Sequence, residues 1–217
     1  SELFMLGRKT VPKLYNMKIR TIGELARTDK NILISKFGKH GAQMWEYSNG
    51  IDNSEVKYKK EKPKGIGNST TLPVDVRNIE KLEEILLAIS EQVAYRLRKY
   101  NMLANVVNVQ LRNSDFKDFS HQGKLENSTS NTKEIYNKAK KLLNEMYKIG
   151  MPIRLIGLRV DNLIEKNEVQ LSLFASKDDK QEKLDSALDK INQKYGYGSI
   201  KRAAKMNVEN FIKLKET

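Results

Sequence analysis

The chain has 217 residues, and its 40 lysines and arginines outnumber its 27 aspartates and glutamates to give a formal net charge of +13 at pH 7. It contains no cysteine and no apolar run of 18 residues, which excludes a disulfide framework, a thiolate metal site and a transmembrane helix and suits a reducing cytoplasm. A positive field concentrates polyanions such as nucleic acid, although a solvated basic surface would show the same charge.

Residues 1–53 are predicted to form a small all-helical domain. Pro12 suits the first turn of a helix, and Thr21 and Glu24 have the spacing of a capping box at the start of the next one. Asp29 is a third candidate cap. A further helix is expected over residues 42–48, after a turn bracketed by two glycines.

The turn before Pro12 has the composition of a phosphate site between two helices. Gly7 allows close approach of the backbone, Arg8 and Lys9 add positive charge, and Thr10 adds a hydroxyl donor beside a helix N-terminus. Met5 stands where a helix-hairpin-helix turn usually has its first glycine. A helix linker with incidental basic residues is the alternative interpretation.

Residues 54–64 are predicted to be an extended linker between domains. They carry five lysines and two glutamates and almost no apolar side chains. A segment that cannot bury apolar surface does not form a core of its own.

Residues 65–166 predict an α+β domain with the order β-α-β-β-α-β. Strands are expected over residues 65–72, 107–111, 115–125 and 153–160, and helices over residues 78–100 and 132–150. Phe116 and Phe119 are expected to anchor the third strand, and Thr132 to cap the second helix. This order places two helices on one face of a four-stranded sheet and leaves the other face for a ligand.

The polar residues of this predicted sheet form a candidate surface for DNA. The long ones, which hydrogen-bond to phosphates, are Asn108, Gln110, Arg112, Arg154 and Arg159. The small ones, which allow close backbone approach, are Gly65, Gly67, Ser69, Thr70 and Thr71. Each taken singly is equally consistent with an exposed strand position. Together, without interleaved aromatic residues, they favour contact with a duplex backbone over stacking on a single strand.

Residues 167–179 carry a short apolar anchor on a polar tether, Gln170-Leu171-Ser172-Leu173-Phe174. Such a segment can present a peptide to a groove on a partner. The alternative is a short buried strand.

Residues 180–217 are predicted to be a helical tail. Leu184, Leu188, Ile191 and Tyr195 have the spacing of an amphipathic helix, which Gly196 would end. The pattern assigns no chemistry to this tail.

The chain shows no catalytic set. Its two histidines lack metal-ligand spacing, and its acidic residues lie mostly on helix faces, where solvation or pairing along the helix accounts for them. It also lacks a Walker-type phosphate loop, a nucleophile elbow and an H-E-x-x-H motif. We therefore expect no catalytic residue, no cofactor and no metal ligand in these residues.

The order of the parts resembles the C-terminal half of the Y-family DNA polymerases of the bacterial DNA polymerase IV type. Residues 3–50 are similar to that family's thumb, through segments such as residues 6–10 and 21–25. Residues 65–161 are similar to its little finger, through residues 64–67, 111–116 and 154–160. Residues 170–174 resemble the family's peptide for the sliding clamp and fall where the family carries one.

The resemblance implies translesion synthesis in DNA damage bypass and repair. The thumb would hold the minor groove of a primer-template duplex and the little finger its major groove, with Gly157 among the contacts. The family's palm, with its Mg²⁺-binding carboxylates, is not in this sequence, so we expect a C-terminal fragment that binds DNA and the clamp without polymerising.

The expected state is a monomer, cytoplasmic and associated with the nucleoid, with no membrane partner. A non-enzymatic, clamp-associated DNA-binding adaptor is the alternative function. A basic protein that binds RNA or the ribosome is a third, and in it residues 170–174 would be an ordinary strand.

Overall fold

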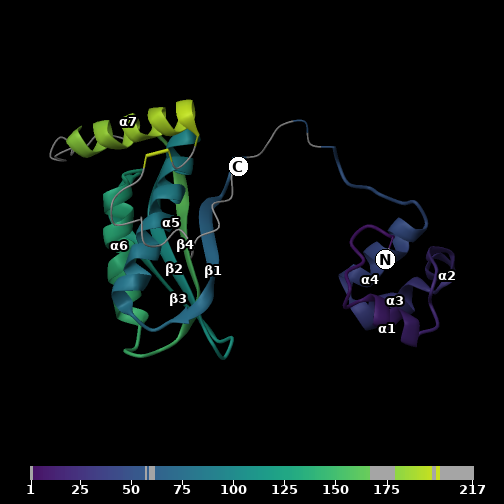
Figure 1. The fold of residues 1–217 in the computed structure, drawn as a ribbon. Helices are drawn as coiled ribbons and strands as arrows, with labels where there is room; N and C mark the ends of the chain where they lie inside the picture. Colours follow the sequence, from purple (N-terminus) through teal and green to yellow (C-terminus); the bar gives the residue numbers. More distant parts are fainter. Residues whose placement is uncertain (1, 57, 59–61, 167–178, 197–198, 201–217) are drawn as a thin grey trace. The chain divides into compact units, whose positions relative to one another are not determined.

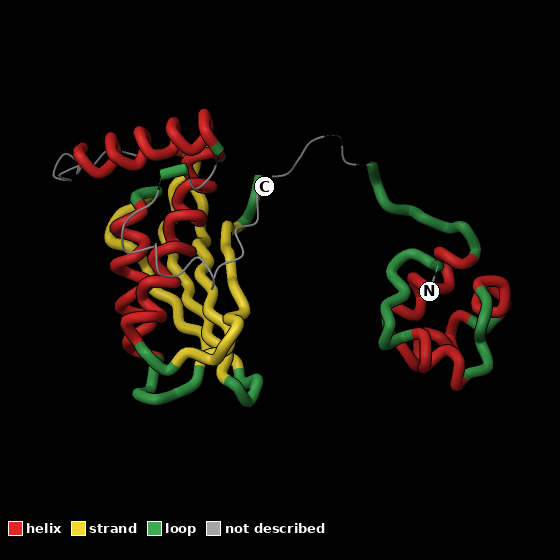
Figure 2. The backbone as a smooth tube through the Cα atoms, viewed as in Figure 1, coloured by secondary structure: helices red, strands yellow, loops and turns green. Residues whose placement is uncertain are grey.

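The computed structural model describes residues 2–56, 58, 62–166, 179–196 and 199–200. It divides into two compact units, residues 1–61 and residues 62–217. Every described element of the first unit is helical, whereas the second combines helices with a sheet (Figure 2). The α+β class is thereby confirmed. In the part of the chain that the structure describes, no helix is both long and apolar enough to span a membrane.

The N-terminal unit packs four short helices around a small core. They are α1 (Val11–Asn16), α2 (Ile22–Arg27), α3 (Lys30–Phe37) and α4 (Lys39–Ser48). The buried apolar side chains of this core are Leu14, Ile19, Leu25, Leu33 and Met44. The capping box of α2 is present: the Glu24 amide donates to Thr21 Oγ1 at 3.1 Å, and the Thr21 amide donates to Glu24 Oε2 at 3.0 Å. Asp29 caps α3 through the Asn31 amide.

Helix α4 begins three residues earlier than predicted. We expected Gly41 in a turn, but it is buried inside α4. A Cβ atom at this position would lie 2.1 Å from the backbone oxygen of Leu33 in α3. The glycine is therefore required for the close approach of α3 and α4 and not for a turn, while Gly38, with φ of 59°, makes the turn between them.

The C-terminal unit has the predicted order β-α-β-β-α-β, followed by one more helix. Its elements are β1 (Gly65–Val76), α5 (Ile79–Lys99), β2 (Met102–Asn113), β3 (Asp118–Thr129), α6 (Thr132–Met146), β4 (Ile153–Glu165) and α7 (Asp179–Tyr195). The sheet is antiparallel throughout, with strand order β1-β4-β2-β3. Helix α5 packs on β1 and β4, and α6 packs on β2 and β3, so that both cover the same face (Figure 1).

The core of this unit lies between the two helices and the sheet. One side of α5 is buried, through residues such as Leu82, Ile89 and Leu97, and so are the alternate residues Val107, Val109 and Leu111 of β2. Burial of each large apolar side chain stabilises the fold by about 1.5–3 kcal/mol. The polar residues between them in β2 consequently face away from the helices.

Several predicted boundaries require correction. Strand β1 continues through Pro73 to Val76, which is tolerated because β1 is at the edge of the sheet. Phe116 does not anchor a strand: it lies in the turn before β3 with φ of 61° and is 65% exposed. Helix α6 is capped by Asn131 instead of Thr132, because the Asn131 side chain accepts from the Lys133 and Glu134 amides. Strand β4 extends beyond residue 160 to Glu165.

Helix α7 lies across the end of α5 (Figure 1), and two of its aspartates pair with Arg98 of that helix. The carboxylate of Asp185 is buried, accepts from the Thr132 amide at 3.1 Å and lies 3.3 Å from Arg98 Nη1. Arg98 Nε also donates to Asp189 at 2.6 Å. Leu184, from the predicted apolar stripe, is 46% exposed. Paired charges therefore attach this helix to the domain.

Candidate nucleic-acid interface

The part of the sheet face away from α5 and α6 in which all four strands pair in continuous register, called here the open face, consists of four rows of residues that cross the strands. Because side chains alternate along a strand, every second residue within this stretch belongs to the open face. In the strand order β1, β4, β2, β3, the rows are Gly65, Asp161, Val106, Lys124; Gly67, Arg159, Asn108, Gln122; Ser69, Gly157, Gln110, Ser120; and Thr71, Leu155, Arg112, Asp118.

Small and uncharged polar residues dominate the open face. Its charged members are Lys124, Arg112 and Arg159, which are basic, and Asp118 and Asp161, which are acidic. Although the chain carries a net charge of +13, these rows are almost neutral. Glycines and hydroxyl residues lie mainly on β1, where they allow another backbone to approach closely.

Arg159 is paired with the aspartate two positions along its own strand. Its Nε lies 2.8 Å from Asp161 Oδ1 and 3.0 Å from Oδ2, and the arginine side chain is 57% exposed. A Cβ atom built on Gly65 would lie 2.2 Å from Asp161 Oδ1 and 2.5 Å from Arg159 Nη2. The glycine on the edge strand thus provides the space in which this ion pair lies.

Arg112 is paired with the aspartate directly opposite it on β3. Its Nε lies 2.8 Å from Asp118 Oδ1 and its Nη2 lies 2.9 Å from Oδ2, which is a bidentate contact. The hydrogen bonds from Arg112 hold the pKa of Asp118 below its ordinary value, and those to Asp118 raise the pKa of Arg112. Both side chains remain accessible to solvent.

The structure brings most of the predicted sheet residues together, but not all. Gly65, Gly67, Ser69 and Thr71 share the open face with the two paired arginines. Thr70 does not join them, because its side chain lies on the helix-covered side and is only 9% exposed. Arg154 stands where the register shifts between β2 and β4, and its guanidinium lies 4.9 Å from the centre of the Phe116 ring.

Gly157 lies in the middle of the open face, opposite Ser69 on one side and Gln110 on the other. A Cβ atom at Gly157 would come within 2.9 Å of the Ser69 Cβ. This glycine therefore keeps the surface low at the centre of the sheet, where any larger side chain would project.

Sequence reasoning missed the acidic partners on this face. Asp161 could have been found, because a residue two positions from Arg159 on a strand shares its face. The sequence predicted a strand that contained both Asp115 and Asp118. Only the register between β2 and β3 identifies Arg112 as the partner of Asp118. Ser120, Gln122 and Lys124 were likewise brought to the face by that register.

Residues 7–10 of the N-terminal unit, predicted to bind phosphate, form a turn before α1. The amides of Thr10 and Val11 donate to the Gly7 oxygen at 2.9 and 3.4 Å, so they are already used within the turn. The side chains of Arg8 and Lys9 are exposed. Met5 has a positive φ of 68°, a conformation that favours glycine.

Two further predictions concern metal and clamp binding. Among the described residues, no three histidine, cysteine, aspartate or glutamate side chains come together in a way that could hold a metal ion. Residues 170–174, predicted to bind a clamp, lie outside the described residues.

Comparisons with known proteins point to one family. Residues 63–173 match the model of the impB/mucB/samB family C-terminal domain. The chain is 43% identical to a DNA polymerase IV of Clostridium acetobutylicum, over 96% of this chain and 52% of that protein. It is 36% identical to a DNA polymerase IV of Clostridium kluyveri, over 90% of this chain and 51% of that protein. The chain thus spans about half the length of these curated relatives.

A solved structure also shares the fold. It is a Y-family DNA polymerase chimera, which matches this chain with a TM-score of 0.53 and 20% sequence identity. The match covers 75% of this chain and 46% of the chimera.

Proposed function

Because the chain belongs to the impB/mucB/samB family, whose C-terminal domain it carries at residues 63–173, we propose that it is the duplex-binding C-terminal part of a translesion DNA polymerase. The relatives named DNA polymerase IV match along almost the whole of this chain. The partner proposed for the chain is a primer-template duplex, bound by a monomer at the nucleoid. The alternative is a clamp-associated DNA-binding adaptor without polymerase activity.

The open face of the sheet is the observation that supports duplex binding best. Serine, threonine, asparagine and glutamine donate single hydrogen bonds to phosphate oxygens, and arginine donates two in parallel. The glycines at positions 65, 67 and 157 keep the surface low enough for a nucleic-acid backbone to approach. None of the four rows contains an aromatic residue, so they offer no platform for stacking unpaired bases.

Nucleotide transfer is assigned to a palm outside these residues. Metal-assisted phosphoryl transfer uses two cations held by clustered carboxylates, and the described residues form no such cluster. They therefore do not fit the family's Mg²⁺ site. The role proposed for this chain is to hold the duplex while a separate active site extends the primer, and the chain alone is expected to be inactive.

Duplex binding is tested by fluorescence anisotropy with a labelled primer-template duplex. The variant Arg112→Ala/Arg159→Ala removes two cations from the open face and is expected to weaken binding about tenfold or more. The control Lys141→Ala removes an exposed cation from α6 and should leave affinity almost unchanged. Equal losses in both variants would indicate non-specific attraction and contradict an interface on the sheet.

Clamp binding is proposed for residues 170–174 on the sequence alone. Gln170 would place its amide in a polar subsite, while Leu171, Leu173 and Phe174 would each gain about 1.5–3 kcal/mol from burial before ordering costs. Micromolar binding to a bacterial sliding clamp should be lost in Gln170→Ala/Leu173→Ala/Phe174→Ala without a change in melting temperature. A variant that fails to fold would make the segment a core strand.

A further inference from the structure

Both arginines of the open face are occupied by carboxylates before any ligand arrives. Arg112 is held by Asp118 across the strand pair, and Arg159 is held by Asp161 along its own strand. Each pair combines one of the three cations in the four rows with one of the two anions. The surface that would meet a polyanion therefore has its guanidinium groups already neutralised.

Strand register and spacing bring the members of each pair together. Asp118 stands directly opposite Arg112 in the register of β2 and β3, which places the two side chains on the same face and side by side. The second pair lies over Gly65, whose missing side chain leaves room for it. Solvent-exposed ion pairs contribute little to folding stability, so these two pairs are not needed to hold the sheet together.

Phosphate and carboxylate compete for the same groups on arginine. Both oxyanions accept parallel hydrogen bonds from a guanidinium, so a phosphate must displace the aspartate to gain the Nε and Nη2 donors of Arg112 or the Nε donor of Arg159. After the exchange, the released carboxylate remains close to the phosphate and repels it. Each arginine–phosphate contact therefore contributes less to the free energy of duplex binding than a contact made by an unpaired arginine.

We propose that Asp118 and Asp161 limit the strength of duplex binding by occupying Arg112 and Arg159. This inference rests on the proposed function, because it concerns the same face of the sheet. As a consequence, the duplex is bound weakly and reversibly, and hydroxyl, amide and backbone groups position it. Weak binding suits a domain that must release the bound phosphates each time the duplex advances.

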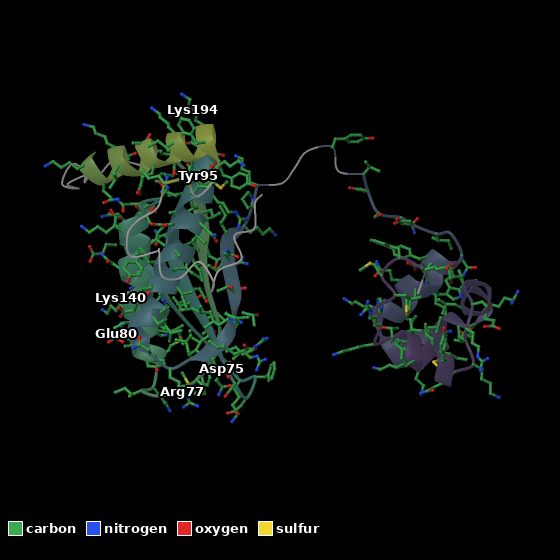
Figure 3. All side chains as sticks on the ribbon, in the orientation of Figure 1. Asp75, Arg77, Glu80, Tyr95, Lys140 and Lys194 are labelled. Carbon is green, nitrogen blue, oxygen red and sulfur yellow. The ribbon has the colours of Figure 1, made fainter. Side chains whose placement is uncertain are left out.

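The test replaces each aspartate with its uncharged isostere. Asp118→Asn and Asp161→Asn should each raise affinity for a labelled primer-template duplex about three- to tenfold at fixed ionic strength, and each should steepen the salt slope by about one. The matched control is Glu80→Gln, which removes the same charge from α5, on the helical layer (Figure 3). It should leave affinity almost unchanged.

A double-mutant cycle separates occupancy from a general change in charge. In an Arg159→Ala background, Asp161→Asn should raise affinity by clearly less than it does when the arginine is present, because only the repulsion between the carboxylate and the duplex is then relieved. The same should hold for Asp118→Asn in an Arg112→Ala background. Equal gains with and without the arginine would overturn the proposal, because removal of a negative charge would then be the whole cause.

The outcomes distinguish this inference from the proposed function. Arginine variants that weaken binding while both aspartate variants leave it unchanged would keep the duplex interface and refute the limiting role. Aspartate variants that lower both affinity and melting temperature would assign these residues to folding and also refute it. If neither set of variants alters binding, the open face is not the duplex site and both proposals fail.

Discussion

The two units of this chain are stabilised in different ways. In the described residues, the N-terminal unit has a core of five buried apolar side chains under helices of six to ten residues. The C-terminal unit buries 24 such side chains beneath helices of 21 and 15 residues. Stability rises with the apolar area removed from water. We therefore expect a small free energy of unfolding for the N-terminal unit and a larger one for the C-terminal unit.

The comparison shows where local interactions matter. In the N-terminal unit, caps such as Thr21 and Asp29 and a close glycine contact at Gly41 supply a large share of what fixes the helices. In the C-terminal unit, packing between the sheet and its two covering helices stabilises most of the structure. The ion pairs of Arg98 with Asp185 and Asp189 attach α7 to it.

Leu33→Ala should unfold the N-terminal unit and leave the other intact. Leu33 is fully buried, and the substitution costs about 2–5 kcal/mol, which is comparable to the whole stability of so small a core. Trp45 is the only tryptophan of the chain and packs against this core, so its fluorescence reports this unit alone. The matched Leu86→Ala in α5 should leave the tryptophan signal native, and a folded Leu33→Ala unit would contradict the comparison.

Asp185→Ala should loosen the attachment of α7 to the C-terminal unit. The Thr132 amide at the start of α6 loses its buried acceptor, which costs about 1–3 kcal/mol, while Arg98 keeps Asp189 as its partner. Hydrogen exchange should accelerate across α7 and at the first turn of α6, with little change in the sheet. The exposed Lys190→Ala on the same helix is the control, and unchanged protection in Asp185→Ala would show that apolar contacts hold the helix.

Thr21→Ala should destabilise only the N-terminal unit, by about 1 kcal/mol, because the Glu24 amide loses its cap.

The backbone hydrogen bonds of Arg20 and Thr21 lower the pKa of Glu24 from its ordinary value of 4.5. The contribution of Glu24 is therefore complete above that value and lost as the pH falls through the lowered one. Urea denaturation, followed by Trp45 fluorescence above pH 4.5 and again below the lowered pKa of Glu24, measures this contribution. A Glu24→Gln variant should show less acid sensitivity than the wild type.

Met5→Gly should stabilise the N-terminal unit slightly, by about 0.5 kcal/mol. The positive φ of Met5 strains a residue with a Cβ atom by about 1 kcal/mol, and the greater freedom of glycine in the unfolded chain offsets part of the gain. The same denaturation measurement is used. Glu2→Gly, a substitution outside the helices, controls for the effect of glycine on the unfolded chain, and a loss of stability in Met5→Gly would show that contacts of the methionine side chain outweigh the strain.

The sequence by itself determined the order of the elements and much of what lies on each face. The stripe of α5, the alternation of β2 and the capping box at Thr21 depend on residues within one or two turns of each other, and such patterns are visible without a partner. The alternation in β2 correctly placed Asn108, Gln110 and Arg112 on one face. The resemblance to Y-family polymerases also followed from local segments in their order.

Tertiary structure alone decided the features that depend on distant neighbours. Asp118 meets Arg112 because of a strand register, and Gly41 is required because the backbone of α3 passes beside it. Asp185 and Asp189 of α7 meet Arg98 because that residue lies at the end of α5. The physical reason is common to all three: a side chain's partner is set by packing between elements, and that packing brings together residues whose spacing in the sequence has no period.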